Sequence, residues 1–485
     1  MQNVLDIVIK LFGYISAPGA SVMMPIIIFI LGIILGAPVG RALRAGLIVG
    51  VGFVGLNLAT GIIGGSLGPA VQAMVAKYNL SMDAIDIGWV PASAIAFASN
   101  IGKLIIPVGI LVNAIMLITG TTQTVNVDIW NYWHFAFTGA MVNSLASLAG
   151  ISGGSAYAMG LAAAALNMVI VMVIADRTAA GLGKYNELPG ISIPHGFTAA
   201  FVPIAAVVNL VLDKIPGINK IKVDMDVIQK RLGVFGEPVL IGVVFGLIIG
   251  GIAGIPFWSI PDGGFVLHGP RGDIAIGMSV VQMAVQMGAA LVLIPKMAAL
   301  LMEGLIPVSE AAQSFIEKHF KGKGTLYIGL DSAIGIGHPI CLTCALILVP
   351  VSIFLAVILP GNRMLPFADL AVIPYIFVLI IPITKGDFFR SLIIGAVVMI
   401  VMFYCGSSLV ELLMTTAARA EPATYAPGVF AGNFSSICDG SNPLTWAMIN
   451  IVKFKWLGII ILLVISVGLA VWNRALIRKE ARAES

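Results

Sequence analysis

Charged residues are scarce in this sequence. Only 10% of its 485 residues are Asp, Glu, Lys or Arg, whereas soluble domains carry roughly 25%. Hydrophobic residues make up 59% of the chain, and its mean hydropathy is +1.04. The net charge of +4 comes from basic residues scattered over loops and forms no stripe that could follow nucleic acid. These properties exclude a soluble enzyme and a nucleic-acid-binding protein, and they indicate a surface that faces lipid.

Motifs that would supply energy or a covalent intermediate are also missing. The sequence has no P-loop, no G-x-S-x-G, no H-E-x-x-H and no nucleotide-binding fingerprint in a strand–turn–helix context. Cysteine occurs four times. Cys341 and Cys344 form a C-x-x-C inside the apolar run PICLTCALILVP, which has no partner motif, so packing explains them better than metal or redox chemistry. We expect no cofactor, no metal and no catalysis by this chain alone.

Long apolar runs are what the sequence offers instead. One of them, WLGIIILLVISVGLAVW from Trp456, approaches the roughly 20 residues that cross a bilayer. The runs are interrupted by 55 glycines and 25 prolines, which indicates close helix contacts and re-entrant hairpins enclosed by protein. Basic loops place the central linker and the C-terminal tail in the cytoplasm and the N-terminus outside. The prediction is an all-α polytopic protein with about eleven transmembrane helices.

The order of motifs in the first half of the chain returns in the second half. The segment that begins DIGWVPAS at Asp86 has its counterpart in DSAIGIGHP at Asp331, and VDIW at Asp128 has its counterpart in FADLA at Asp369. EKHFKGKG is rich in lysine, whereas its first-half equivalent has a single lysine, Lys77, so we expect inverted repeats. The predicted parts of this one domain are an amphipathic N-terminal segment (1–22), a first membrane repeat (23–212), a basic cytoplasmic linker (213–235), a second repeat with a final helix (236–472) and a cytoplasmic tail (473–485).

A few polar residues lie where the predicted repeats break their helices. An ionisable group at membrane depth costs a few kcal/mol on insertion scales, so each needs a partner, a cavity or a role. Carboxylate, imidazole and hydroxyl groups suit a sugar or polyol, whose hydroxyls both donate and accept, and aromatic rings pack its C–H faces. The candidate substrate-binding residues are His195, Asp331, His134, His338, Ser192, Asp86 and Trp89.

Other interpretations of the same residues remain open. Asp331 and the three histidines could cap re-entrant helix ends, and Asp86, Asp128 and Asp369 are equally suited to be helix N-caps. Trp130 and Trp133 could stack on substrate or anchor the chain at the membrane interface. The chief functional alternative is a proton- or sodium-coupled secondary transporter of a small polar solute, in which these groups would carry the coupling ion.

Several long strings resemble the galactitol-type IIC permeases of bacterial phosphotransferase systems. They include WVPASAIAFASNIGKLIIPVGILVNAIML, NVDIWNYWHFAFTGA, GISIPHG, DKIPGINKIKVDMDVIQKRLGVFGEPV, YIGLDSAIGIGH and LPGNRMLPFADLA, and the resemblance covers nearly the entire chain. Some stretches depart from the galactitol pattern, among them PFWSIPDGGFVLHGPRGD. The resemblance therefore implies a polyol or sugar substrate such as galactitol, without fixing which one.

The resemblance also implies partners and an architecture. It implies separate cytoplasmic IIA and IIB proteins, with a phosphocysteine on IIB that phosphorylates the substrate as it is released inside. Asp331 or His195 would then be a possible proton acceptor for the reacting hydroxyl. A more distant relation to ascorbate-type permeases implies a homodimer in the bacterial inner membrane, with an elevator-type core and a scaffold of V-shaped helix pairs.

Overall fold

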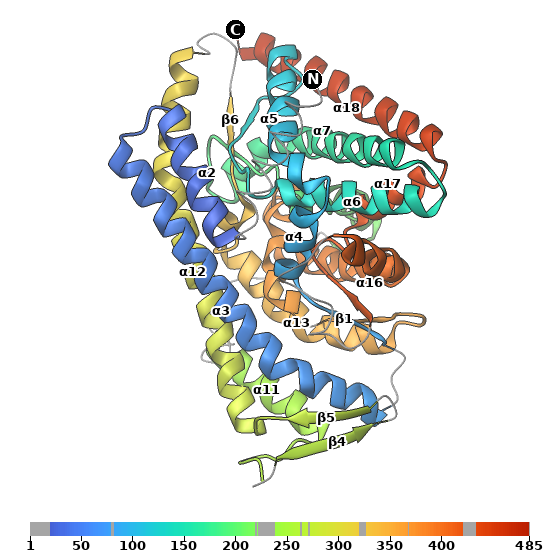
Figure 1. Ribbon diagram of the computed structural model, residues 1–485. Helices are drawn as coiled ribbons and strands as arrows, with labels where there is room; N and C mark the ends of the chain where they lie inside the picture. The colour runs from blue at the N-terminus through green and yellow to red at the C-terminus, as the bar shows by residue number, and fades with distance from the viewer. Residues whose placement is uncertain are drawn as a thin grey trace.

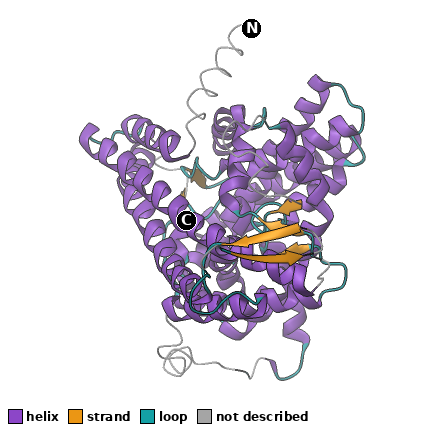
Figure 2. Ribbon diagram, turned by 60° about the horizontal axis from the view of Figure 1, so that its bottom comes forward, coloured by secondary structure: helices purple, strands orange, loops and turns teal. Residues whose placement is uncertain are grey.

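The protein is predominantly helical, with a few short strands (Figure 2). The computed structural model describes residues 20–78, 82–218, 221, 238–261, 264–269, 272–319, 326–366, 368–420 and 433–484. Most of the predicted N-terminal segment and most of the predicted linker lie outside these residues. The expectation of an all-α chain holds for the bulk of the described part, but it missed two small parallel sheets and a hairpin.

Apolar helices of membrane-crossing length confirm a multi-pass membrane protein. Six helices in the described ranges are long and apolar enough to span a bilayer. They are Gly102–Thr119, Gly153–Tyr185, Gly196–Lys214, Pro339–Ile358, Phe388–Arg419 and Trp456–Arg482. Further apolar helices are shorter than a full span, so the larger number of about eleven stays a prediction.

One side of the molecule consists of long packed helices (Figure 1). They are α2 (Ala20–Ile34), α3 (Val39–Tyr78), α11 (Pro238–Ala253) and α12 (Val280–His319). Helices α3 and α12 run antiparallel: Arg44 Nη2 lies 3.2 Å from Glu303 Oε1, while Ser66 Oγ, later in α3, lies 3.8 Å from Met287 Sδ, earlier in α12. We call these four helices the long-helix layer.

The other side is a compact bundle of helices packed around the breaks between them (Figure 1). Its helices are α4 (Trp89–Ala98), α5 (Gly102–Thr119), α6 (Tyr132–Leu148), α7 (Gly153–Tyr185), α8 (Gly196–Ala199), α9 (Val202–Lys214), η3 (Ser332–Gly335), α13 (Pro339–Ile358), η4 (Ala368–Val372), α14 (Ile373–Val378), α15 (Ile380–Thr384), α16 (Phe388–Arg419), α17 (Pro443–Val452) and α18 (Trp456–Glu484). Proline and side-chain caps begin several of them. Asn442, for example, accepts hydrogen bonds from the amides of Leu444 and Thr445 at the start of α17.

Two three-stranded parallel sheets join distant parts of the chain inside the bundle. The strands are β1 (Ala84–Asp86), β7 (Met364–Leu365) and β8 (Asn433–Ser435) in one sheet, and β2 (Thr124–Asn126), β6 (Tyr327–Gly329) and β3 (Ile191–Ser192) in the other. Their orders are β7-β1-β8 and β2-β6-β3. Each sheet therefore has a central strand from one half of the chain and two outer strands from the other half. This exchange satisfies backbone groups that lie outside helices.

Beside each sheet, one aspartate accepts hydrogen bonds that connect the sheet to neighbouring segments. Arg363 donates from Nε and Nη2 to Asp83 at 2.9 and 2.8 Å, and Asn433 also donates to Asp83. These hydrogen bonds hold the pKa of Asp83 below its ordinary value. Beside the other sheet, Asp176 of α7 accepts from Thr124 Oγ1 at 2.7 Å and Asn473 Nδ2 at 2.6 Å, which connects this sheet to α18.

A two-stranded antiparallel hairpin adjoins the long-helix layer. It consists of β4 (Phe265–Gly269) and β5 (Gly272–Ile276), which pair from Phe265 opposite Ile276 to Gly269 opposite Gly272. The hairpin lies at the end of the layer where α3 finishes and α12 begins (Figure 1). Sequence analysis noted this stretch, within PFWSIPDGGFVLHGPRGD, only as a departure from the galactitol pattern.

The α6–α7 contact depends on two glycines that face each other. A Cβ added to Gly160 would lie 2.6 Å from the Gly139 carbonyl oxygen, and one added to Gly139 would lie 2.6 Å from the Gly160 carbonyl oxygen. The neighbours are backbone atoms, which cannot rotate away as a flexible side chain can. Close backbone approach through small residues is how helices associate in membranes, where lipid offers no hydrophobic driving force between them.

We predict that Gly160→Ala lowers the thermal stability of the detergent-solubilised protein. Overpacking of this kind costs about 1–3 kcal/mol, because α6 and α7 must move apart. Gly154→Ala is the matched control, since it lies on the same helix with nothing within 4 Å of the added Cβ. A melting temperature of Gly160→Ala equal to that of Gly154→Ala would show that the two helices are not in this close contact.

Candidate functional site

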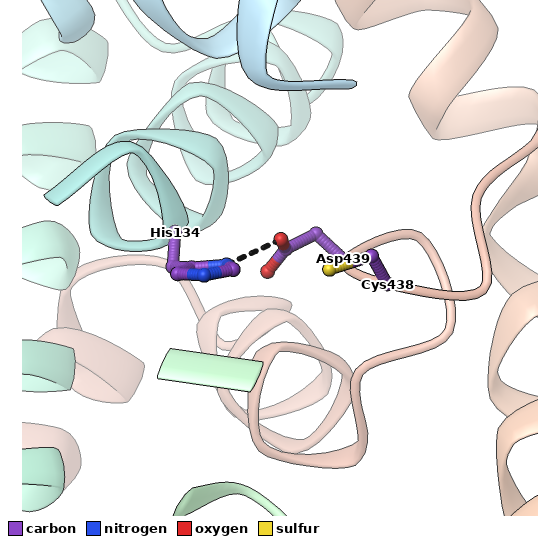
Figure 3. A group of neighbouring side chains, drawn as sticks. All are labelled: His134, Cys438 and Asp439. Atoms are coloured by element: carbon purple, nitrogen blue, oxygen red, sulfur yellow. Dashed lines mark hydrogen bonds and ion pairs between the residues drawn. The ribbon is translucent and has the colours of Figure 1, made fainter. Parts of the chain in front are cut away.

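A buried hydrogen bond between His134 and Asp439 forms the inner end of the candidate site. His134 lies in the first turn of α6, and Asp439 lies in the turn after β8. His134 Nδ1 is 2.6 Å from Asp439 Oδ2, and the two side chains are 2% and 0% exposed. Figure 3 shows the imidazole and the carboxylate directed toward each other, with Cys438 beside them. Residues from both halves of the chain therefore meet here.

His195 extends this pair across the interior. It follows Pro194 as the N-cap of α8, and its Nδ1 accepts a hydrogen bond from the Thr198 amide at 3.3 Å. Its other ring nitrogen, Nε2, lies 3.4 Å from His134 Nε2, and the ring centroids are 4.5 Å apart. His195 is therefore a helix cap, the interpretation that sequence analysis kept open beside substrate binding. Capping uses only Nδ1, and Nε2 faces His134.

The Thr198 amide fixes the tautomers of both histidines. A backbone N–H can only donate, so His195 Nδ1 must carry a lone pair, and the ring proton of the neutral imidazole is on Nε2. That proton points to His134 Nε2, which must accept it, so the His134 proton is on Nδ1. Asp439 Oδ2 is then the acceptor at the end of a one-directional chain.

Asp331 is the most exposed ionisable group that contacts these hydrogen-bonded side chains. It is the N-cap of η3, and its Oδ1 accepts from the Ala333 amide at 2.8 Å. The same oxygen lies 3.7 Å from His195 Nε2, and the Asp331 side chain is 18% exposed against 6% for His195. We call Asp439, His134, His195 and Asp331 the carboxylate–histidine cluster; it is closed at Asp439 and open at Asp331.

Hydroxyl groups and aromatic rings surround the cluster. Thr198 Oγ1 donates to Ser332 Oγ at 2.9 Å, which joins the caps of α8 and η3. The ring of Trp133 lies 4.0 Å from that of His134, and Tyr375 lies 6.0 Å from His195. Within the described part of the chain, Trp133 Nε1 and Asp439 Oδ1 are buried and meet no hydrogen-bond partner in good geometry. Such orphaned polar atoms are common at functional sites.

The two tryptophans on this segment lie in the protein interior. Trp130 is 6% exposed and Trp133 is 1% exposed. Trp130 packs on Phe97 with a ring separation of 5.2 Å. This burial disagrees with an anchor at the membrane interface, and it places Trp133 against the cluster instead.

Three other predicted residues lie near the sheets and not in the cluster. The Ser192 hydroxyl, in β3, lies 2.8 Å from Thr124 Oγ1. Asp86 accepts from the amides of Gly88 at 3.1 Å and Ile437 at 3.0 Å, and the Trp89 amide donates to Asp369 at 2.7 Å. The contacts of Asp86 and Asp369 with backbone amides favour the capping interpretation. A substrate role for Asp86, Ser192 and Trp89 stays a prediction.

His338 is placed apart from the cluster. It is the N-cap of α13, where its Nδ1 accepts from the Ile340 amide at 3.3 Å, and it is half-buried near Glu187 and the backbone of Tyr185. The structure therefore brings together three of the predicted residues, His134, His195 and Asp331, and leaves His338 to a separate position.

Sequence reasoning missed Asp439, Cys438 and Tyr375 as neighbours of the site. Asp439 lies in the polar stretch CDGSNP, and this break in the apolar pattern was a usable signal for its carboxylate. Tyr375 carried no such signal, because it lies in the apolar stretch of α14. One ligand atom each from His134, Cys438 and Asp439 lies within 4.8 Å of the others. That set could bind a divalent metal, although a hydrogen bond already joins two of its members.

Comparison with known proteins agrees with this architecture. A sequence model of the family described as "PTS system sugar-specific permease component" matches residues 14–426. The chain is 38% identical over 442 residues to the PTS system galactitol-specific EIIC component of Escherichia coli (strain K12), covering 91% of this chain and 90% of that protein. It is 35% identical over 476 residues to a putative permease IIC component of the same organism, covering 98% of this chain and 100% of that protein. The chain belongs to the sugar-specific permease components, the EIIC proteins, of the phosphotransferase system.

Proposed function

We propose that this EIIC protein binds galactitol or a closely similar polyol at the carboxylate–histidine cluster and translocates it. The observation that carries the proposal is the placement of Asp331, which is the one ionisable member of the cluster with substantial exposure. The galactitol-specific relative supports the substrate class. Partner EIIA and EIIB subunits supply the phosphoryl group, because the sequence contains no nucleotide-binding motif.

The cluster suits neutral polyhydroxylated substrates. Asp331 accepts hydrogen bonds from hydroxyl groups, and the His195 Nε2 proton, shared over 3.4 and 3.7 Å contacts, can be donated to a substrate oxygen. Thr198 and Ser332 add hydroxyls that donate or accept. Tyr375 provides apolar ring surface for C–H groups, while Trp133 packs against His134 behind it. Vicinal hydroxyls of a polyol need this combination of donors and acceptors.

The tautomers favour Asp331 over His195 as proton acceptor. In the transfer, a substrate hydroxyl oxygen forms a bond to phosphorus, the bond to the EIIB cysteine sulfur breaks, and the hydroxyl proton goes to a base. His195 Nδ1 is occupied by the Thr198 amide and its Nε2 already carries a proton, so it can only donate in this arrangement. Asp331 has free acceptor capacity beside it. The EIIC chain then contributes positioning and one proton transfer.

We infer two inverted repeats with the boundaries 23–212 and 236–472. In support, α3 and α12 are both 40 residues long and each leads into the central strand of a sheet. The flanking strands also correspond in order, β2 with β7 and β3 with β8. In this proposal about eleven helices span the membrane, the long-helix layer is the V-shaped scaffold and dimer interface, and the bundle is the elevator core.

The proposed orientation places the C-terminus in the cytoplasm of a bacterial cell, with the protein in the inner membrane. Ser466 of α18 donates to the Leu166 carbonyl of α7 at 3.4 Å, and further along both helices Arg177 pairs with Glu480 at 2.8 Å, so these helices are parallel and end on the same side. Arg390 at the start of α16 pairs with Asp213 at the end of α9, next to the basic linker. An excess of basic residues on this side supports a cytoplasmic location.

The orientation predicts the labelling of introduced cysteines. Arg478→Cys, near the end of α18, should react with an impermeant maleimide only in inverted membrane vesicles. Lys453→Cys, before α18, should react only in right-side-out vesicles. The four native cysteines are buried and give a low background. Reaction of both variants from one face would contradict the orientation.

The site predicts weaker substrate binding in Asp331→Asn and His195→Ala. Losing one hydrogen bond to a buried polar ligand group costs about 1–3 kcal/mol, so each Kd for galactitol should rise roughly tenfold or more. Equilibrium binding of radiolabelled galactitol to purified protein measures this.

The control for these two variants is His268→Ala, in strand β4 of the hairpin beside the long-helix layer. It should bind galactitol like the unmodified protein. If Asp331→Asn and His195→Ala are present at normal levels and also bind normally, the cluster is a structural set of caps and the substrate site lies elsewhere.

Energy coupling separates the proposal from a secondary transporter. Uptake in proteoliposomes should require phosphoenolpyruvate, the general phosphocarriers, EIIA and EIIB, and the product inside should be phosphorylated. A proton or sodium gradient alone should give no accumulation. Accumulation of unmodified polyol driven by such a gradient would favour the ion-coupled alternative.

A further inference from the structure

We propose that a second, outward-facing polyol site lies in a polar cavity at the end of the bundle, separate from the carboxylate–histidine cluster. The cavity has a volume of about 300 Å³, the size at which small-molecule sites begin. Its polar lining residues include Asn143, Ser144, Tyr157, Thr416 and Arg419. The inference rests on the proposed function for its substrate class and on the proposed orientation for its side of the membrane.

The cavity is built where five helices of the bundle begin or end; Asn100, in its lining, lies two residues before α5. Ser99 follows α4, Ser147 lies in the last turn of α6, Gly153 begins α7 and Arg419 ends α16. Because α7 ends and α16 begins on the side proposed to be cytoplasmic, this cavity lies on the opposite side. Ser144 is ten residues after His134 on α6, which places it roughly 15 Å along the helix axis. The cavity is therefore not part of the cluster.

A packed polar layer separates the cavity from the cluster. Thr138 of α6 lies 2.7 Å from Thr445 of α17, oxygen to oxygen, and Asn167 of α7 donates to Thr138 at 2.8 Å. All three side chains are buried. Substrate in the cavity would have to pass this layer, or the layer would have to move, before the substrate reached His134.

Unused hydrogen-bonding groups point to a ligand. The Tyr157 hydroxyl is buried and has no hydrogen-bond partner. Ser144, Asn143 and Arg419 line the same cavity with a hydroxyl, an amide and a guanidinium group. The Tyr157 hydroxyl has almost no accessible surface, so a ligand would bond it only after the ring turned toward the cavity; that bond would recover the free energy that the unsatisfied hydroxyl costs. Together these groups supply both donors and acceptors, as a polyol requires.

Helix polarity favours a neutral polyol over an anion. Three of the five helix termini here are C-terminal ends, from α4, α6 and α16, and α5 and α7 present their N-termini. C-terminal ends carry partial negative charge and unpaired carbonyls, which repel anions and accept from hydroxyl groups. Arg419 is the one cation in the lining and it is exposed, so the lining does not form an anion cradle.

Transport measured from the two faces tests the proposal. In right-side-out vesicles, Tyr157→Phe and Ser144→Ala should each raise the KM for galactitol about three- to tenfold, the effect of one lost hydrogen bond. In inverted vesicles, phosphorylation of galactitol offered from the cytoplasmic face should keep its normal KM. The matched control is Tyr404→Phe on α16, whose hydroxyl donates to the Pro360 carbonyl at 3.3 Å outside the cavity.

Chemical labelling gives a readout that does not depend on transport. Ser147→Cys should react with an impermeant maleimide from outside, and galactitol should slow the reaction. The protection should persist when His195→Ala is combined with Ser147→Cys, because the two sites are separate. Protection that disappears with His195→Ala would overturn an independent site, as would stronger protection by inorganic phosphate than by galactitol.

The outcomes separate this inference from the proposed function. If the unmodified protein neither binds nor takes up galactitol or another hexitol, the proposed function is wrong. If it does so while Tyr157→Phe and Ser144→Ala keep a normal KM from outside, the function stands and the cavity site is wrong. Equal changes of KM from both faces would also overturn the cavity site, because they would indicate a general change in the bundle.

Discussion

Where a helix breaks in the interior of this protein, the backbone N–H and C=O groups need hydrogen-bond partners from elsewhere in the protein. Lipid offers no hydrogen bonds, so the breaks between helices must be closed internally. The chain does this with two small sheets, with capping carboxylates and histidines, and with bridges such as the one from Arg363 to Asp83. The carboxylate–histidine cluster is one product of this constraint: His195 and Asp331 cap helices with one atom and present another to the site.

The sequence was sufficient to predict a large part of this arrangement. Scarce charge and long apolar runs predicted a multi-pass membrane protein, and repeated motifs predicted where the helices break. The same breaks contained His134, His195 and Asp331. Local patterns succeed here because an ionisable residue in an apolar setting is costly enough to be conspicuous.

What the sequence could not predict are contacts between segments far apart in the chain. The short strands have two or three residues each, too few for an alternating pattern to be recognised. Asp439 lies 305 residues after His134, and nothing in either local sequence specifies their pairing. The choice of tautomer depended on a single amide, that of Thr198, whose direction is set by the fold. His338 had the same local features as His195 but a different place in three dimensions.

The exchange of strands between the halves has a consequence for biosynthesis. Asp83, next to β1, is bonded to Asn433, 350 residues later in the chain. At roughly 5–20 residues per second, about 20 to 70 s pass between the synthesis of these two residues. During that interval β1 lacks β8, and until Met364 has been made it lacks β7 as well, so its backbone groups need a temporary partner such as the insertion machinery, a chaperone or water. A ribosome that stops before β8 leaves a product whose first sheet cannot close, which quality-control proteases can distinguish from the finished protein.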